Sequence, residues 1–217
     1  MNPRTAFLGA PLLTFTYGVI RIVDGLDGVR GPGTAWTTGH LAFIAAMALF
    51  TVAFGQLCRM AGNGRLATAL SAIATAGALC LIAQFTIDVV AGALTGDHHM
   101  MSEAIARISA VPAVSPIVYQ AGPFLFCGGM LALVVQLAAM RRIKAWTPFL
   151  VLCDLLLPMA NKDFIPLCAT LLLVSFTSLS RHTPGRDHLN QHQKLGETHG
   201  PGHATMRSAP FPGGQNR

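Results

Sequence analysis

Charged residues are scarce in this sequence. Asp, Glu, Lys and Arg make up 11% of its 217 residues, whereas a typical soluble domain carries about 25%. Hydrophobic residues make up 52%, so a soluble protein of this length would lack the polar side chains needed to cover its surface. Lipid is the alternative solvent, and the composition therefore predicts an integral membrane protein.

The excess of basic residues does not indicate a nucleic-acid-binding protein. The formal net charge is +6, but Lys and Arg lie at the ends of apolar runs and in the C-terminal tail, not in a patch among aromatic residues. No nucleic-acid-binding motif accompanies them. Basic residues at the ends of apolar runs are typical of membrane proteins. We therefore expect membrane lipid, and no nucleic acid, among the partners.

Several catalytic and metal-binding motifs are absent. The five cysteines form no CxxC pair, so neither a disulfide framework nor a zinc site is indicated, and the thiols are expected to pack as small hydrophobic side chains. HExxH, GxSxG and Walker motifs are missing. The sequence also lacks DDxxD, of which Asp24-x-x-Asp27 is a partial echo, and the aspartate run of CDP-alcohol phosphotransferases. Chemistry on a magnesium-bound diphosphate is therefore disfavoured.

Histidine gives little support for a cofactor. His40 is the one histidine placed inside a predicted span, because His98 and His99 lie in a loop. A haem held by two histidines would need a second one within the membrane. His188 and His192 have a spacing that suits a metal on one face of a helix, but they lie in a polar tail. We therefore predict no metal and no cofactor.

The apolar residues form six runs, and a helix that spans a membrane needs about 20 such residues. The first run resembles a signal sequence, but it lacks a small-x-small cleavage site and is interpreted as an uncleaved helix. The last two runs are short, so they are either two tilted helices, which we favour, or one re-entrant hairpin. The predicted spans are residues 5–23, 36–58, 66–92, 117–140, 146–160 and 164–180. Residues 1–180 are thus expected to form one all-α bundle of about six transmembrane helices.

Basic residues also predict the orientation of the helices. With six spans, and with only the part of the tail near the last span counted, nine Lys and Arg residues fall on the side of the two termini and four on the other side. Basic residues are enriched on the cytoplasmic side of membrane proteins, so both termini of this multi-pass protein of the cell membrane are predicted to be cytoplasmic. The nine are Arg4, Arg59, Arg65, Arg141, Arg142, Lys144, Arg181, Arg186 and Lys194, and the four are Arg21, Arg30, Arg107 and Lys162.

The loop before the fourth span has a helical pattern of its own. Apolar residues from Met101 to Ile108 recur at helical spacing, while Glu103 and Arg107 lie on another face. This pattern predicts a short amphipathic helix on the outer surface of the membrane. Two prolines, at positions 112 and 116, are expected to end it before the fourth span.

The last 37 residues differ in composition from the rest of the chain. Residues 181–217 are rich in His, Gly, Pro and Gln and hold few apolar residues. Such a segment cannot bury enough apolar surface to fold by itself. We therefore predict a disordered cytoplasmic tail.

Small residues are frequent in the fourth predicted span. Gly122, Gly128, Gly129 and Ala132 leave room for a second helix to approach closely. Close helix packing is the favoured interpretation, and a glycine-lined ligand groove is the alternative.

Ionisable residues inside a membrane are costly and are candidate functional residues. Asp24 follows the first predicted span, Asp88 lies near the outer end of the third, and Asp154 lies midway along the fifth. A desolvated carboxyl group favours its protonated form, so these three residues are the candidate proton donors. The alternative for each is a structural ion pair or hydrogen bond, such as a local pair between Arg21 and Asp24. Gln84 shares a helix face with Asp88.

Two segments, YGVIRIVDGLDG and GPGTAWTTGHLAF, resemble small multi-pass membrane proteins of actinobacteria. In size, helix number and intramembrane carboxylates, residues 5–180 also resemble the integral-membrane terpene cyclases of bacterial meroterpenoid and prenyl-indole pathways. That resemblance implies a metal-independent cyclisation of a prenyl chain, started by protonation. Asp24, Asp88 or Asp154 would be the proton donor.

These observations predict a terpene cyclase-like enzyme of isoprenoid biosynthesis that acts on a hydrophobic small molecule. Aromatic side chains would shape the carbocation and exclude water from it. The alternative is a small membrane protein without enzymatic activity that transports, senses or supports a partner, in which case a homo-oligomer would compensate for its size. The predicted substrate-binding residues are Tyr17, Trp36, His40, Phe85, Tyr119 and Phe124.

Overall fold

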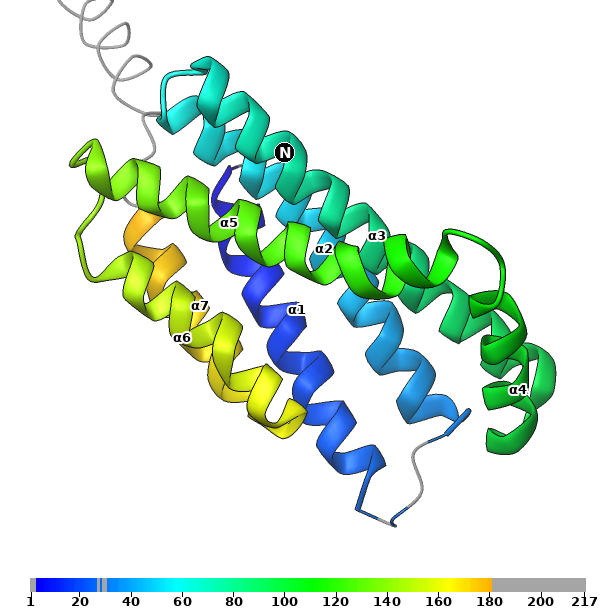
Figure 1. Cartoon of the computed structure of the whole chain (residues 1–217). Helices are drawn as coiled ribbons and strands as arrows, with labels where there is room; N and C mark the ends of the chain where they lie inside the picture. Colours follow the sequence, from blue (N-terminus) through cyan, green and yellow to red (C-terminus); the bar gives the residue numbers. More distant parts are fainter. Residues whose placement is uncertain (1–2, 27, 29–30, 181–217) are drawn as a thin grey trace, which may run out of the picture. The chain divides into compact units, whose positions relative to one another are not determined.

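A computed structural model describes residues 3–26, 28 and 31–180, and the regular structure within these ranges is entirely helical (Figure 1). The predicted tail at 181–217 lies outside the described residues, as do Asp27 and Arg30. The helices are α1 (Pro3–Asp24), α2 (Thr34–Met60), α3 (Arg65–Thr95), α4 (His98–Ser109), the π-helix η1 (Val114–Ala121), α5 (Gly122–Ala139), α6 (Thr147–Ala160), the 3₁₀ turn η2 (Lys162–Phe164) and α7 (Ile165–Ser180).

Four helical segments are long and apolar enough to cross a membrane. They are Arg4–Asp24, Thr34–Met60, Arg65–Thr95 and the joined η1–α5 segment Val114–Ala139. The described part of the chain thus has four candidate spans, which indicate a multi-pass membrane protein. At a rise of 1.5 Å per residue, α6 (14 residues) and α7 (16 residues) are only about 21–24 Å long, and the six-span topology stays a prediction.

Residues that accept unusual backbone angles separate the helices. Gly62 (φ 84°) and Asn63 (φ 55°) make the turn between α2 and α3, and Gly96 (φ 63°) follows the last residue of α3. Glycine and asparagine adopt this left-handed conformation at low cost. The predicted amphipathic helix is present as α4. Pro116 does not precede the fourth span as predicted but lies in the first turn of η1, where its missing amide proton would have no partner anyway.

The helices pack in the order of the sequence, and the last one returns to the first (Figure 1). Contacts join α1 to α2, α2 to α3, α3 to α5, α5 to α6 and α6 to α7, and α7 in turn packs on α1. The two short helices therefore complete the bundle between α5 and α1. The short α4 contacts α3 and η1.

Aromatic rings from four helices fill the centre of the bundle. Phe50 of α2 is 1% exposed, and the centroid of its ring lies 5.3 Å from that of Phe126 on α5 and 6.1 Å from that of Phe176 on α7. Phe7 of α1 packs edge-on against Phe176, with their centroids 5.4 Å apart. Phe50 thus packs α2 against both α5 and α7.

Helices α3 and α5 approach each other through glycines. A Cβ atom at Gly129 would stand 2.6 Å from the backbone nitrogen of Ala74, and one at Gly122 would stand 2.5 Å from the Cβ of Cys80. From α3, Gly77 faces the backbone of Phe126 in the same way. The predicted close packing is confirmed for Gly122 and Gly129, whereas a Cβ at Gly128 would meet nothing within 4 Å.

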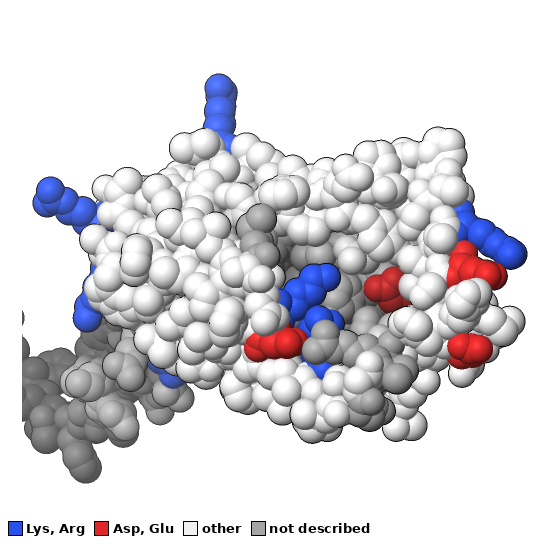
Figure 2. Space-filling view, turned by 60° about the horizontal axis from the view of Figure 1, so that its bottom comes forward, with Lys and Arg blue, Asp and Glu red and all other residues white. Residues whose placement is uncertain are grey.

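The charged residues divide between the two ends of the bundle. The connections α1–α2, α3–α4 and α6–α7 form one end, which we call the acidic end because it carries Asp24, Asp97, Glu103 and Asp163. Figure 2 shows acidic side chains on the face that includes this end. The α2–α3 and α5–α6 connections at the opposite end carry Arg65, Arg141, Arg142 and Lys144, with Arg59 in the last turn of α2. This separation agrees with the charge asymmetry on which the predicted orientation depends.

Candidate functional site

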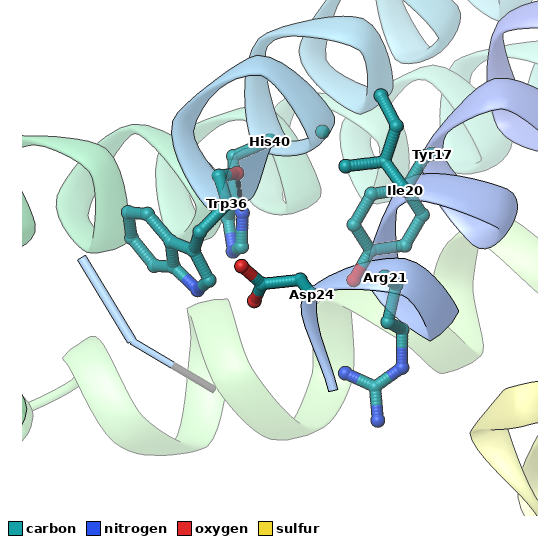
Figure 3. Close-up of a pocket in the computed structure, with 7 residues that line it drawn as sticks. Tyr17, Ile20, Arg21, Asp24, Trp36 and His40 are labelled. Atoms are coloured by element: carbon teal, nitrogen blue, oxygen red, sulfur yellow. Dashed lines mark hydrogen bonds between the residues drawn. The ribbon is translucent and has the colours of Figure 1, made fainter. Parts of the chain in front are cut away.

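A small polar pocket lies between the ends of α1 and α2, at the acidic end of the bundle (Figure 3). Its cavity measures about 40 Å³. The lining residues are Tyr17, Ile20, Arg21 and Asp24 from α1, and Trp36, Gly39 and His40 from α2.

Helical spacing explains why these residues share one pocket. Positions 17, 20, 21 and 24 follow the i, i+3, i+4, i+7 pattern and therefore lie on one face of α1. On α2, His40 lies one turn after Trp36. Gly39 lets the two helices approach, because a Cβ atom there would stand 3.1 Å from Cγ2 of Ile20. One wall of the pocket thus comes from the end of α1 and the other from the start of α2.

His40 is buried in the wall of the pocket, with 9% of its surface exposed. Its Nδ1 lies 2.8 Å from the carbonyl oxygen of Trp36. A carbonyl oxygen only accepts hydrogen bonds, so Nδ1 carries the proton and Nε2 of the neutral ring is left as a proton acceptor. The carboxyl group of Asp24 and the imidazole ring of His40 point toward one another (Figure 3).

Aromatic rings from three helices surround the imidazole. Its ring centroid lies 3.9 Å from that of Trp36, 5.0 Å from that of Phe85 on α3 and 5.9 Å from that of Tyr17. Phe43 stacks on Phe85 with a centroid distance of 4.1 Å and completes the group. These four rings, which we call the aromatic enclosure, shield the faces of the imidazole from lipid and water.

Arg21 connects the pocket to the short helices. Its Nε lies 3.8 Å from Oδ1 of Asp163 in η2, an ion pair between the end of α1 and the α6–α7 connection. That Nε is buried and makes no hydrogen bond with any described residue. The partner Asp163 lies far along the chain from Arg21, and the local pair between Arg21 and Asp24 stays a sequence-based prediction.

The three candidate proton donors lie in three different settings. Asp24 lines the pocket around His40, whereas Asp88 of α3 neighbours Tyr119 of η1. Asp154 of α6 is buried, close enough to Cys127 of α5 and Cys168 of α7 to interact with them electrostatically. The three carboxyl groups thus have different neighbours and do not line one common pocket.

The structure brings together four of the six predicted substrate-binding residues. Tyr17, Trp36, His40 and Phe85 meet around the pocket. Tyr119 lies in η1 beside Asp88, and Phe124 lies on α5 with 67% of its surface exposed. Sequence reasoning did not name Phe43 or Asp163 as site residues. Phe43 follows His40 by three positions and therefore shares its helix face, which is a signal that the sequence contains.

An open groove adjoins the pocket. Its volume is about 450 Å³, and it lies between the first turn of α2 and the last turn of α3. The indole ring of Trp36 rests on Gly92, where a Cβ atom would come within 2.9 Å of its Cζ3. The groove is lined by Pro32, Gly33, Thr34, Thr37, Thr38, Gly92, Ala93 and Gly96.

Comparisons with models of protein families, with curated proteins and with solved structures find no match to this chain. Within the described ranges, no group of three or more His, Cys, Asp and Glu side chains is arranged to hold a metal ion. The class of this protein is therefore described by its architecture. It is a helical protein with four candidate membrane spans and a polar pocket between the first two of them.

Proposed function

We propose that this membrane protein binds and releases a proton at His40, as part of a transport or sensing function. The observation that carries the proposal is the setting of the imidazole, which is fixed by the Trp36 carbonyl, enclosed by aromatic rings and open to a polar cavity. Histidine is the side chain whose charge changes most readily near neutral pH. A buried histidine inside a membrane span is costly and points to such a role.

The size of the cavity supports a proton rather than a large substrate. About 40 Å³ has room for a few water molecules. Water in this space would connect Nε2 of His40 with the side chains of Arg21 and Asp24, which line the same cavity. Because the aromatic enclosure shields the faces of the imidazole, a proton would reach the ring through this cavity.

Protonation of His40 should be visible in the fluorescence of Trp36. The centroids of the two rings lie 3.9 Å apart, with the ring planes tilted by 33°, and a charged imidazole at this distance quenches indole emission. In a Trp146→Phe background, the emission of the remaining Trp36 is expected to titrate with pH and to lose most of that response in His40→Gln. His99→Gln is the matched control, because His99 is exposed on α4. An unchanged titration in His40→Gln would remove the basis of the proposal.

The same variants separate transport from sensing. In liposomes that contain a pH-sensitive dye, wild type is expected to carry protons along an imposed gradient if it transports, with at least a tenfold loss in His40→Gln. A titration of Trp36 without flux in wild type would assign the sensing role instead.

The proposed topology has six spans, with both termini in the cytoplasm of a cell-membrane protein. Two observations support it. The short helices α6 and α7 complete the bundle between α5 and α1. If α1 and α5 lie in the membrane, α6 and α7 would therefore lie in it as well. The basic residues of the α2–α3 and α5–α6 connections lie at one end, as the positive-inside rule requires for a single cytoplasmic side.

A terpene cyclase-like activity is the second proposal, and the aromatic enclosure beside Asp24 supports it. Electron-rich ring faces stabilise a passing cation. The closed cavity is too small for a prenyl chain, so the substrate would enter from the groove past Trp36. Membranes with wild type are expected to convert a prenylated aromatic compound or indole to an isomer of unchanged mass without added metal. Asp24→Asn should abolish that product, and the absence of any isomer across a substrate panel would contradict this proposal.

A further inference from the structure

A carboxyl group is buried among the last three helices of the bundle, apart from the pocket around His40. Asp154 lies midway along α6, with 9% of its surface exposed. Helix α6 packs on α5, on α7 and on η2, whereas the pocket around His40 is formed by α1 and α2. Asp154 is therefore a buried ionisable group to which the proposed function of His40 assigns no role.

The helices around this carboxyl group contain no other charge. The sequences of α5 and α7 hold no Asp, Glu, Lys, Arg or His, and α6 holds none besides Asp154. The side chains on these helices that interact with it electrostatically are the thiols of Cys127 on α5 and Cys168 on α7. A protonated thiol carries no charge and is only a weak hydrogen-bond donor. Neither thiol can therefore offset a negative charge on Asp154.

The remaining neighbours of Asp154 supply no partner either. Among the described residues, its carboxyl group makes no hydrogen bond and no ion pair. The connection η2 holds Lys162, which is exposed, and Asp163, which pairs with Arg21 of α1. Cys153, which precedes Asp154 on α6, is a further thiol. An ionised Asp154 would thus be a charge without a counter-charge inside the bundle.

A proton neutralises such a group better than a metal ion does. An isolated carboxylate inside a protein or a membrane is costly, and it takes up a proton instead. Hard cations prefer several oxygen ligands, whereas the ionisable neighbours of Asp154 are thiols. Softer metals need more ligands than these, and the described ranges hold no group of three or more His, Cys, Asp and Glu arranged for one.

The backbone at Asp154 is also special. In an α-helix, the carbonyl oxygen of one residue accepts a hydrogen bond from the amide four positions later. The residue four positions after Asp154 is Pro158, which has no amide proton, so this helical hydrogen bond is missing. A proline inside a helix also bends or loosens it. Both effects make the part of α6 between Asp154 and the acidic end a suitable path for proton exchange.

We propose that Asp154 is a second proton-binding site of this protein, which holds an exchangeable proton in the folded chain at neutral pH. A bound proton accounts at once for the burial of the carboxyl group, the lack of a counter-charge on three helices and the thiol neighbours. The site does not depend on the proposed role of His40, since the two sites share no residue and no helix.

Infrared spectroscopy of the purified full chain in lipid detects this proton directly. A protonated carboxyl group has a carbonyl stretching band that a carboxylate lacks, and the band shifts in D₂O if the proton exchanges. At neutral pH, wild type is expected to show such a band, which should shift in D₂O and disappear in Asp154→Asn. Asp97→Asn is the matched control and should keep the band, because Asp97 is an exposed helix cap and asparagine caps equally well.

Thermal unfolding of the same variants gives a second measurement. The amide of asparagine has the shape of a protonated carboxyl group, so Asp154→Asn should fold and, at neutral pH, unfold no lower than wild type. Above about pH 4 an unfolded chain releases the proton of an aspartate, whereas the folded chain would keep it. Wild type should therefore lose stability relative to Asp154→Asn as the pH rises, by roughly 3 °C for each pH unit over which the folded chain keeps the proton.

Two outcomes would overturn the proton site at Asp154. One is the same carboxyl band in wild type and in Asp154→Asn. The other is an unfolding temperature of the variant that lies below that of wild type by a constant amount at every pH, which would mark Asp154 as a carboxylate with a partner. The pH titration of Trp36, which tests His40, should be unchanged in Asp154→Asn, so the two proposals can fail separately.

Should Asp154→Asn fail to fold, chemical labelling of wild type decides the question. Dicyclohexylcarbodiimide adds to protonated carboxyl groups in apolar surroundings, and mass spectrometry of the peptides locates the adduct. An adduct on Asp154 at neutral pH that diminishes as the pH rises supports the site. Peptides that carry no adduct at Asp154 exclude it.

Discussion

Gly77→Leu is expected to prevent the bundle from assembling. A Cβ atom at Gly77 would stand 2.6 Å from Cα of Phe126 and 2.7 Å from the carbonyl carbon of Leu125. Backbone atoms cannot rotate away as the end of a flexible side chain does, so α3 and α5 would have to separate. Helix association in lipid depends on close packing rather than on a hydrophobic driving force, and the lost contact has no substitute.

Gly128→Leu is the matched control for this prediction. It places the same side chain on α5, where a Cβ atom meets nothing within 4 Å. Fluorescence-detected size-exclusion chromatography of tagged variants should show a monodisperse peak for Gly128→Leu and aggregated or absent material for Gly77→Leu. Similar peaks and unfolding temperatures for the two variants would mean that α3 and α5 do not meet at Gly77.

Phe50→Ala is expected to cause the largest loss of stability among substitutions that leave the helices in place. Phe50 is 1% exposed and contacts Phe54, Phe126 and Phe176. Removing a buried ring leaves a cavity that its neighbours fill only in part. Because part of the usual Phe→Ala cost reflects transfer from water, which is weaker in lipid, we expect a loss of about 2–3 kcal/mol. That corresponds to roughly 5–10 °C in unfolding temperature.

Phe124→Ala provides the comparison. Phe124 lies on α5 with 67% of its side chain exposed, so its removal leaves no cavity inside the bundle. Its unfolding temperature in detergent should stay within about 2 °C of wild type, in keeping with the small effect of most surface substitutions. A larger shift for Phe124→Ala than for Phe50→Ala would show that the centre of the bundle is not where the structure places it.

Local signals predicted the helices well. The turn residues Gly62 and Asn63 and the sequence around Gly96 mark boundaries through their own backbone preferences, so they can be recognised without knowledge of the fold. The pattern from Met101 to Ile108 is equally local and gave α4. Helical spacing alone puts Tyr17, Arg21 and Asp24 on one face of α1, and they line one wall of the pocket.

Relations between distant segments could not be predicted in this way. Nothing near Arg21 in the sequence indicates that Asp163 is its partner, because that ion pair depends on how α7 returns to α1. The contact of Trp36 with Gly92 likewise depends on the offset of α2 against α3. For the same reason, the predicted substrate residue Tyr119 was placed with Tyr17, although in the structure it neighbours Asp88.

In the six-span topology proposed above, the two short helices have a consequence for the lipid around them. At about 21–24 Å, α6 and α7 fall short of a hydrocarbon core of about 30 Å, while α2 and α3, with 27 and 31 residues, exceed it. A bilayer meets such a mismatch by thinning beside the short segments and thickening or tilting beside the long ones. The two aqueous phases would then come closest next to α6 and α7, and the membrane voltage would drop over the shortest distance there. An ionisable group on that side, Asp154 among them, would lie in the steepest part of the field.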